Sequence, residues 1–142
     1  MALLETIPDR YYSPIVLEDE TGAVFNKIVK DYFEQCCNRC CAVEIQEIID
    51  VNDPTVRQWL LKTRPVLIIY NIEKFGADTH WQNRFFDLMN FVFDNHIHII
   101  ITSGVPINKL SVEGRIYARL NWGVREALEI ENLGEEEHDE VF

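Results

Sequence analysis

The chain has 142 residues and a mass of 16.7 kDa, which fits one domain. Its 47% hydrophobic and 26% charged residues are typical of a globular protein with a real core. The 24 acidic and 13 basic residues give a net charge of −11, which argues against direct nucleic-acid binding. No apolar stretch reaches the roughly 20 residues of a membrane span, and the N-terminus does not read as a secretory signal. We therefore expect a cytoplasmic protein.

The first half of the chain alternates short apolar runs with helical patterns. Residues 14–17 predict a strand, and apolar side chains then recur at helical spacing over 23–38. A second strand is expected at 42–45. Asp53 and Pro54 open the next helix, because Asp is a favoured N-cap residue and Pro is tolerated at the first helical position.

The second half continues the same alternation. Strands are expected at 66–70, 97–101 and 127–130, and helices at 81–94 and 112–120. The run at 66–70 is apolar throughout, as in parallel strands that are buried on both faces. This order predicts a three-layer α/β fold with a mostly parallel, five-stranded sheet.

The pattern divides the chain into an N-terminal segment at 1–13, one domain at 14–132 and a tail at 133–142. The tail carries the run Glu-Glu-Glu-His-Asp-Glu after Gly134. We expect it to be solvated and dispensable for folding, because it offers little to bury.

The cysteines and two of the histidines are candidate metal ligands. Four cysteines crowd into six residues: Cys36, Cys37, Cys40 and Cys41. A zinc site is the less favoured alternative to reduced, buried thiols, because four thiolate ligands usually come from two separate pairs. His96 and His98 alternate on an expected strand without an evident third ligand, so a structural role is expected.

The first strand, turn and helix have the outline of a phosphate-binding loop but not its residues. Such a loop needs glycines for close backbone approach and Lys followed by Ser or Thr. Here the turn contains Glu18, Asp19, Glu20 and a single Gly22, and Lys27 comes too late. Because like charges would repel a triphosphate, we expect no bound nucleotide. We expect no other cofactor either.

Four segments of the second half have an order and spacing that can be compared with known families. They are residues 67–73, residues 81–90 with Trp81, residues 100–103, and residues 115–123, which end in Arg-Leu-Asn-Trp-Gly. Their order and spacing resemble the AAA+ base domain of the DnaA/Hda family, the bacterial replication initiator and its regulatory inactivator. The segments at 71–73 and 119–123 look nearest to Hda. The resemblance covers about 14–131 and implies a three-layer AAA+-like (P-loop NTPase-like) core.

The sequence departs from the family at the ATP-handling positions. The family's Walker A lysine falls on Phe25 and its Thr on Asn26. Its Walker B aspartate falls on Tyr70, with Asn71 at the adjacent acidic position. Without that carboxylate nothing holds Mg²⁺ at the strand end. The family's helical lid and the DNA-binding domain of DnaA are also not expected in this chain. The resemblance thus implies a pseudo-ATPase that is not an enzyme.

Arg115 and Arg119 lie four residues apart and share one face of a helix. In the family, the position of Arg119 is an arginine finger that reaches a neighbouring subunit's nucleotide. The resemblance therefore implies that both arginines contact DnaA or another AAA+ partner, with the Arg119 guanidinium free to reach outward. The alternative is a surface ion pair with Glu113 or Glu126.

Other conspicuous residues are assigned structural roles. Trp59, Trp81 and Trp122 are expected in the core, because large aromatic side chains are usually buried. Asn71 and Glu73 end a strand and are expected to cap the segment that follows.

The sequence leads to one main interpretation and one alternative. The main one is a non-catalytic, DnaA/Hda-like interaction module that regulates chromosomal replication initiation by contacting an AAA+ partner. The alternative is an AAA+-derived scaffold protein with an unrelated partner. Residues 3–8 occupy the place of Hda's clamp-binding peptide, but the glutamine that opens that peptide is absent, so a sliding-clamp partner is a minor hypothesis.

Overall fold

The computed structural model describes residues 14–19, 24–36, 42–45, 48–74 and 78–128. The expectations for the N-terminal segment, for the cysteines at 37, 40 and 41, and for the acidic tail lie outside this part of the chain. Within it, no helix is long and apolar enough to cross a membrane.

Five strands form a single sheet in the order β2-β3-β4-β1-β5, and every neighbouring pair is parallel. They are β1 (Ile15–Asp19), β2 (Ala42–Glu44), β3 (Val66–Ile69), β4 (Ile99–Ser103) and β5 (Val124–Leu128). In the centre, Ile15 pairs with Ile100 of β4 and with Val124 of β5. The five-stranded parallel sheet expected from the apolar runs is confirmed.

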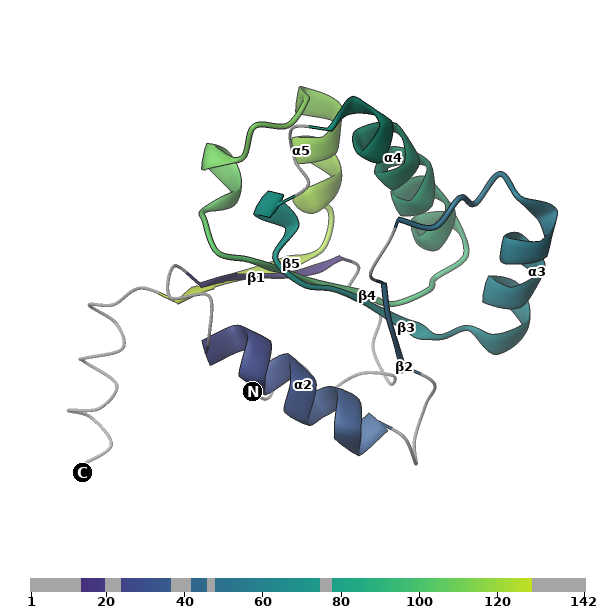
Figure 1. Cartoon of the computed structure of the whole chain (residues 1–142), viewed down its shortest axis with the longest axis horizontal. Coiled ribbons are helices and arrows are strands. Elements are labelled where there is room, and N and C mark those ends of the chain that lie inside the picture. The colour runs from purple at the N-terminus through teal and green to yellow at the C-terminus, as the bar shows by residue number, and fades with distance from the viewer. Residues whose placement is uncertain (1–13, 20–23, 37–41, 46–47, 75–77, 129–142) are drawn as a thin grey trace.

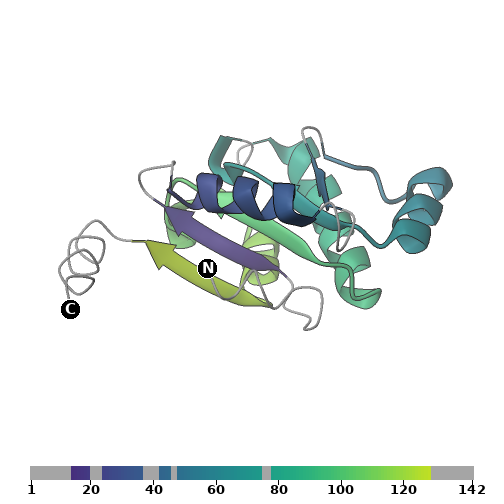
Figure 2. The same cartoon turned by 90° about the horizontal axis from the view of Figure 1, so that it is seen from below.

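Helices cover both faces of the sheet (Figure 1). They are α2 (Val24–Cys36), α3 (Pro54–Thr63), α4 (Thr79–Asp94) and α5 (Gly114–Leu120), with the short 3-10 helices η1 (Ile72–Lys74) and η2 (Ile107–Lys109). Helix α2 lies alone on one face, whereas α4 and α5 lie on the other with α3 beyond the edge at β2 (Figure 1). Figure 2 shows α2 in front of the sheet from below. The chain therefore has the three layers that the sequence predicted.

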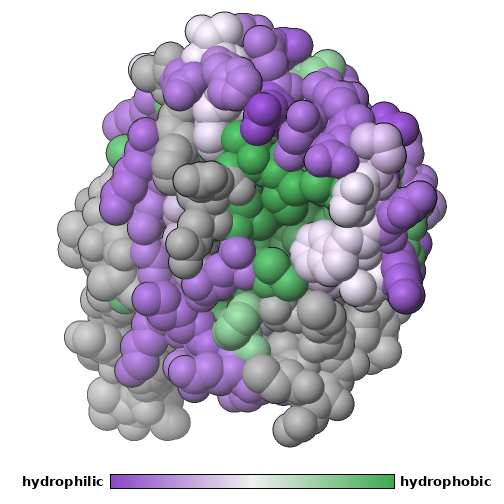
Figure 3. Space-filling model, turned by 45° about the vertical axis from the view of Figure 1, so that its right-hand side comes forward, coloured by the Kyte–Doolittle hydropathy of each residue, from purple (hydrophilic) through white to green (hydrophobic). Residues whose placement is uncertain are grey.

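Alternation along the strands divides the core into two clusters. On β1, Ile15 and Leu17 pack toward α2 with Phe25, whereas Val16 packs in the larger cluster with Phe85. The ring of Phe85 stacks on that of Trp81 with 4.7 Å between centroids. Half-buried apolar side chains also reach the surface on the side of α3 and β2 (Figure 3).

Side-chain caps set several helix boundaries. Asp53 accepts a hydrogen bond of 2.9 Å from the backbone N–H of Thr55, which confirms the expected start of α3. Asp78 likewise accepts from the N–H of Trp81 at 3.1 Å, so α4 begins at Thr79, earlier than predicted.

The expected strand at 97–101 begins later than its apolar pattern indicated. His96 has a φ of 53°, in the left-handed region, and the N–H of Ile97 bonds to the carbonyl of Val92. Strand β4 therefore starts at Ile99, and the prediction that His96 and His98 share a strand face is wrong.

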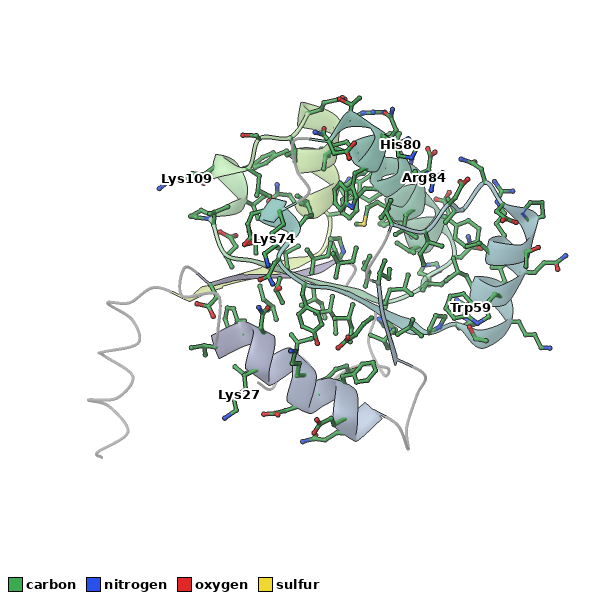
Figure 4. The ribbon with its side chains drawn as sticks, viewed as in Figure 1. Lys27, Trp59, Lys74, His80, Arg84 and Lys109 are labelled. Carbon is green, nitrogen blue, oxygen red and sulfur yellow. The ribbon has the colours of Figure 1, made fainter. Side chains whose placement is uncertain are left out.

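Two of the three tryptophan predictions are wrong. Trp81 is 7% exposed, as expected for the core, but Trp59 is 38% and Trp122 39% exposed. Trp59 stands on α3 (Figure 4), where Leu60 is the buried residue. Because neighbouring residues on a helix point about 100° apart, burial of Leu60 turns Trp59 toward solvent.

Candidate functional site

The carboxyl ends of parallel strands meet at one edge of the sheet, which is where open α/β folds bind ligands. In this chain β1 and β4 end there in polar residues, and Tyr70 and Asn71 follow β3. Hydrogen bonds join these residues to one another and to backbone N–H groups of neighbouring elements.

Two carboxylates at the end of β1 are buried and hold backbone N–H groups. Asp19 is 2% exposed, and its Oδ2 accepts from the N–H of Phe25 at 2.9 Å, in the first turn of α2. Glu18 is also buried, and its Oε2 accepts from the N–H of Ile107 at 3.2 Å. A helix N-terminus is where a phosphate binds in nucleotide sites, so Asp19 places a carboxylate of the chain itself at that position.

Phe25 and Asn26, which the resemblance places at the Walker A lysine and threonine, make structural contacts. Phe25 is 6% exposed and belongs to the core between α2 and the sheet. Asn26 donates from Nδ2 to Oδ1 of Asn71 at 3.0 Å, and the N–H of Asn71 donates to Oγ1 of Thr102 at 2.9 Å. These bonds connect α2 with the ends of β3 and β4.

Tyr70 is the residue that the resemblance places at the Walker B aspartate. Burial raises the pKa of its phenol, and the negative charge of Glu44 raises it further. The ammonium of Lys30 lies 5.7 Å from the ring centroid. A phenol that stays neutral gives Mg²⁺ no anionic ligand, and in the described residues no cluster of metal-ligating side chains occurs.

Glu73 reaches across to the loop after β4. Its Oε1 accepts from the N–H of Gly104 at 3.0 Å, and a Cβ at position 104 would lie 2.5 Å from Oε2. Glycine thus permits the close approach. We expected Asn71 and Glu73 to cap the next segment; their side chains instead bond to other elements, so that prediction is wrong.

The structure places Arg115 and Arg119 together on α5, facing α4. Arg115 forms an ion pair of 2.7 Å with Glu113, the local partner that the sequence offered, and also donates to Asn83. Arg119 is half-buried, and its Nε donates to Oδ1 of Asn90 at 2.9 Å.

Arg119 differs from the expected freely extended side chain. Its guanidinium carbon lies 4.4 Å from the ring centroid of Phe86 and 4.2 Å from that of Trp122. Phe86 and Asn90 lie four residues apart on α4, and the sequence interpretation gave neither a role. Their spacing was visible as one helix face, but their pairing with Arg119 depends on how α4 and α5 pack.

The strand order and the helices on both faces define an α/β core of the AAA+ type, as the resemblance implied. No family model matches the chain. Among characterised proteins, it is similar to DnaA of Bacteroides thetaiotaomicron, with 32% identity over 89 residues, 61% of this chain and 19% of that protein. DnaA of Deinococcus deserti is 24% identical over 123 residues, 86% of this chain and 22% of that protein. The chain therefore spans about a fifth of the length of these relatives.

Solved structures give the same relationship. AMPPCP-bound DnaA from Aquifex aeolicus matches with a TM-score of 0.75 at 16% identity, over 91% of this chain and 45% of that chain. Domain III of DnaA from Thermotoga maritima matches with a TM-score of 0.66 at 22% identity, over 90% of this chain and 60% of that chain. At these identities the structures establish the fold alone. Together with the sequence matches, they show that the chain resembles the AAA+ domain of DnaA.

Proposed function

We propose that the chain is a non-catalytic, DnaA-like module that regulates replication initiation by binding DnaA or another AAA+ partner, without handling ATP itself. The assignment to replication initiation is supported by the resemblance of the chain to the AAA+ domain of DnaA. The buried Asp19 carboxylate at the N-terminus of α2 is the observation that carries the non-catalytic part.

Charge and packing both support the loss of nucleotide binding. A phosphate at the N-terminus of α2 would have to displace Asp19 and would meet the negative charge of Glu18 nearby. Phe25 is packed in the core where the family's lysine would project toward phosphate. Tyr70 supplies no carboxylate for Mg²⁺.

We predict that the protein does not bind ATP with Mg²⁺ at micromolar concentrations. Titration calorimetry on the full chain would measure this, with an ATP-binding DnaA as the positive control. A micromolar dissociation constant for ATP would contradict the proposal that the chain does not handle ATP.

The arginine face of α5 supports the partner-binding half of the proposal. Among the described ion pairs, Glu113 neutralises Arg115 but no carboxylate pairs with Arg119. A guanidinium keeps its charge and pairs with oxyanions through a planar fork, so Arg119 suits a charge-assisted contact with a partner.

We predict that Arg119→Ala weakens association with ATP-bound DnaA about tenfold or more, because a charge-assisted hydrogen bond is worth ~1.5–3 kcal/mol. Binding and the partner's ATP hydrolysis rate would both be measured. Arg84→Ala is the matched control, since Arg84 is a half-exposed arginine on α4 (Figure 4) with a long 3.9 Å ion pair to Asp50. Unchanged affinity and hydrolysis in Arg119→Ala would leave the scaffold alternative standing.

A further inference from the structure

Five side chains from α4, α5 and the turn after α5 form one layered surface, which we name the stacked patch: Arg115, Phe86, Arg119, Trp122 and Phe93. Arg115 lies 4.6 Å from the ring centroid of Phe86, on which Arg119 also packs. Trp122 in turn contacts the ring of Phe93 with 4.5 Å between centroids. Arginine and aromatic side chains thus follow one another in continuous contact.

Much of this apolar surface is open to solvent. The large hydrophobic side chains exposed in the described residues are Trp59, Leu61, Phe93, Tyr117 and Trp122. Phe93 and Trp122 belong to the stacked patch, and Tyr117 lies on the same helix as Arg119. Exposed Trp and Tyr beside Arg is the composition of interface hot spots, which gain energy when a partner removes them from water.

The charge of the stacked patch is unlike that of the chain as a whole. The chain carries −11, yet no ion pair to Arg119 occurs among the side chains that the structure describes, which do not include those of residues 124–128, and its Nε bonds to the neutral amide of Asn90. Because no described carboxylate neutralises Arg119, its charge is available to a carboxylate of a partner.

The packing of Arg119 leaves part of its guanidinium open to an anion beside the exposed rings of Trp122 and Phe93. Phe86 and Trp122 flank its guanidinium, and Asn90 engages Nε, so the terminal Nη groups are the donors that remain without a described acceptor. These donors lie in the guanidinium plane and match a planar carboxylate in two parallel bonds.

We propose that the stacked patch docks a segment of a partner protein that sets a carboxylate against Arg119 and an apolar side chain against Trp122 and Phe93. That the partner is an AAA+ protein rests on the proposed function. The chemistry of the segment rests on the contacts above.

The first experiment needs no identified partner. The ¹⁵N-labelled full chain is titrated with the peptide acetyl-Glu-Leu-Phe-Glu-amide and with its Gln-Leu-Phe-Gln counterpart, while the three indole N–H signals are followed by NMR. We expect the acidic peptide to shift the Trp122 signal and to bind about tenfold more tightly than the amide peptide. Trp59, which is exposed to the same extent on α3, is the internal control and should not move. Arg119→Gln should remove the preference for the acidic peptide.

Several outcomes would overturn the proposal. These are no shift of Trp122 at millimolar acidic peptide, equal binding of both peptides, an equal shift of Trp59, or a stronger response to inorganic phosphate. Self-association that Trp122→Ala abolishes would also overturn it, because the occupant would be a second copy.

A second experiment separates this inference from the proposed function. Wild type, Trp122→Ala and the control Trp59→Ala are tested for binding to ATP-bound DnaA. Peptide binding without DnaA binding would keep the docking surface and reject the DnaA partner. Strong DnaA binding that Trp122→Ala leaves unchanged would reject the docking surface and keep the proposed function.

Discussion

Phe25→Lys, which restores the family's loop lysine, is expected to lower the free energy of unfolding by about 3 kcal/mol or more without conferring ATP binding. The substitution removes an aromatic side chain that packs with Ile15 and Leu17. It also forces an ammonium group into a site where Phe25 is 6% exposed. Truncating a buried Phe costs ~3–5 kcal/mol, and burying an unpaired charge adds to the loss. Urea unfolding and ATP calorimetry on the same sample would measure both effects.

Phe25→Leu is the matched control for this experiment. It keeps a smaller apolar side chain and buries no charge, so it should cost less stability than Phe25→Lys. If Phe25→Lys were as stable as Phe25→Leu and bound ATP, the N-terminus of α2 would still be able to form a nucleotide site, and the proposed loss of ATP handling would be wrong.

Local sequence signals determined most of the fold. The apolar runs at Val66–Ile69 and Ile99–Ser103 are buried parallel strands, as such runs predict. Asp53 sets the start of α3 through a hydrogen bond two residues away, so the cap could be read from adjacent residues. Errors of a few residues arose at ends where a single backbone angle, such as that of His96, decides the boundary.

Contacts between distant elements could not be predicted in the same way. Periodicity puts Trp122 near a helix end, but it cannot show that Arg119 and Phe93 cover part of the ring while the rest stays exposed. Asn90, the acceptor for Arg119, comes from another helix. The two arginines of the proposed partner-contact surface could therefore be named from the sequence, whereas the contacts that surround them required the packing of α4 on α5.

Internal hydrogen bonds occupy the carboxyl edge of the sheet, where open α/β folds bind ligands. The sequence identified Glu18 and Asp19 as charges that would repel phosphate. The structure adds that they accept backbone N–H groups from η2 and α2, one of them 89 residues away. Asn71 and Glu73 make comparable links to β4 and the loop that follows it. The chain's own groups thus link these elements to one another, which supports the proposal that no nucleotide is needed to order them.

That conclusion predicts a stability cost when one internal anion is removed. Asp19→Ala should lower the free energy of unfolding by about 1–3 kcal/mol, because the N–H of Phe25 loses its buried acceptor. Removing a negative charge from the N-terminus of α2 acts in the same direction. Urea unfolding would give the magnitude, and faster hydrogen exchange at the Phe25 amide would localise it.

Two control variants make the Asp19 result specific. Asp19→Asn keeps a side-chain oxygen that can accept the Phe25 N–H, so it should recover part of the stability lost in Asp19→Ala. Asp94→Ala removes an exposed carboxylate from the end of α4 and should change stability by less than ~0.5 kcal/mol. If Asp19→Ala behaved like Asp94→Ala and left Phe25 protected from exchange, the carboxylate would not be what orders the N-terminus of α2. The N-terminus of α2 would then depend on another group for its order, and the proposal that Asp19 takes the place of a phosphate would lose its physical basis.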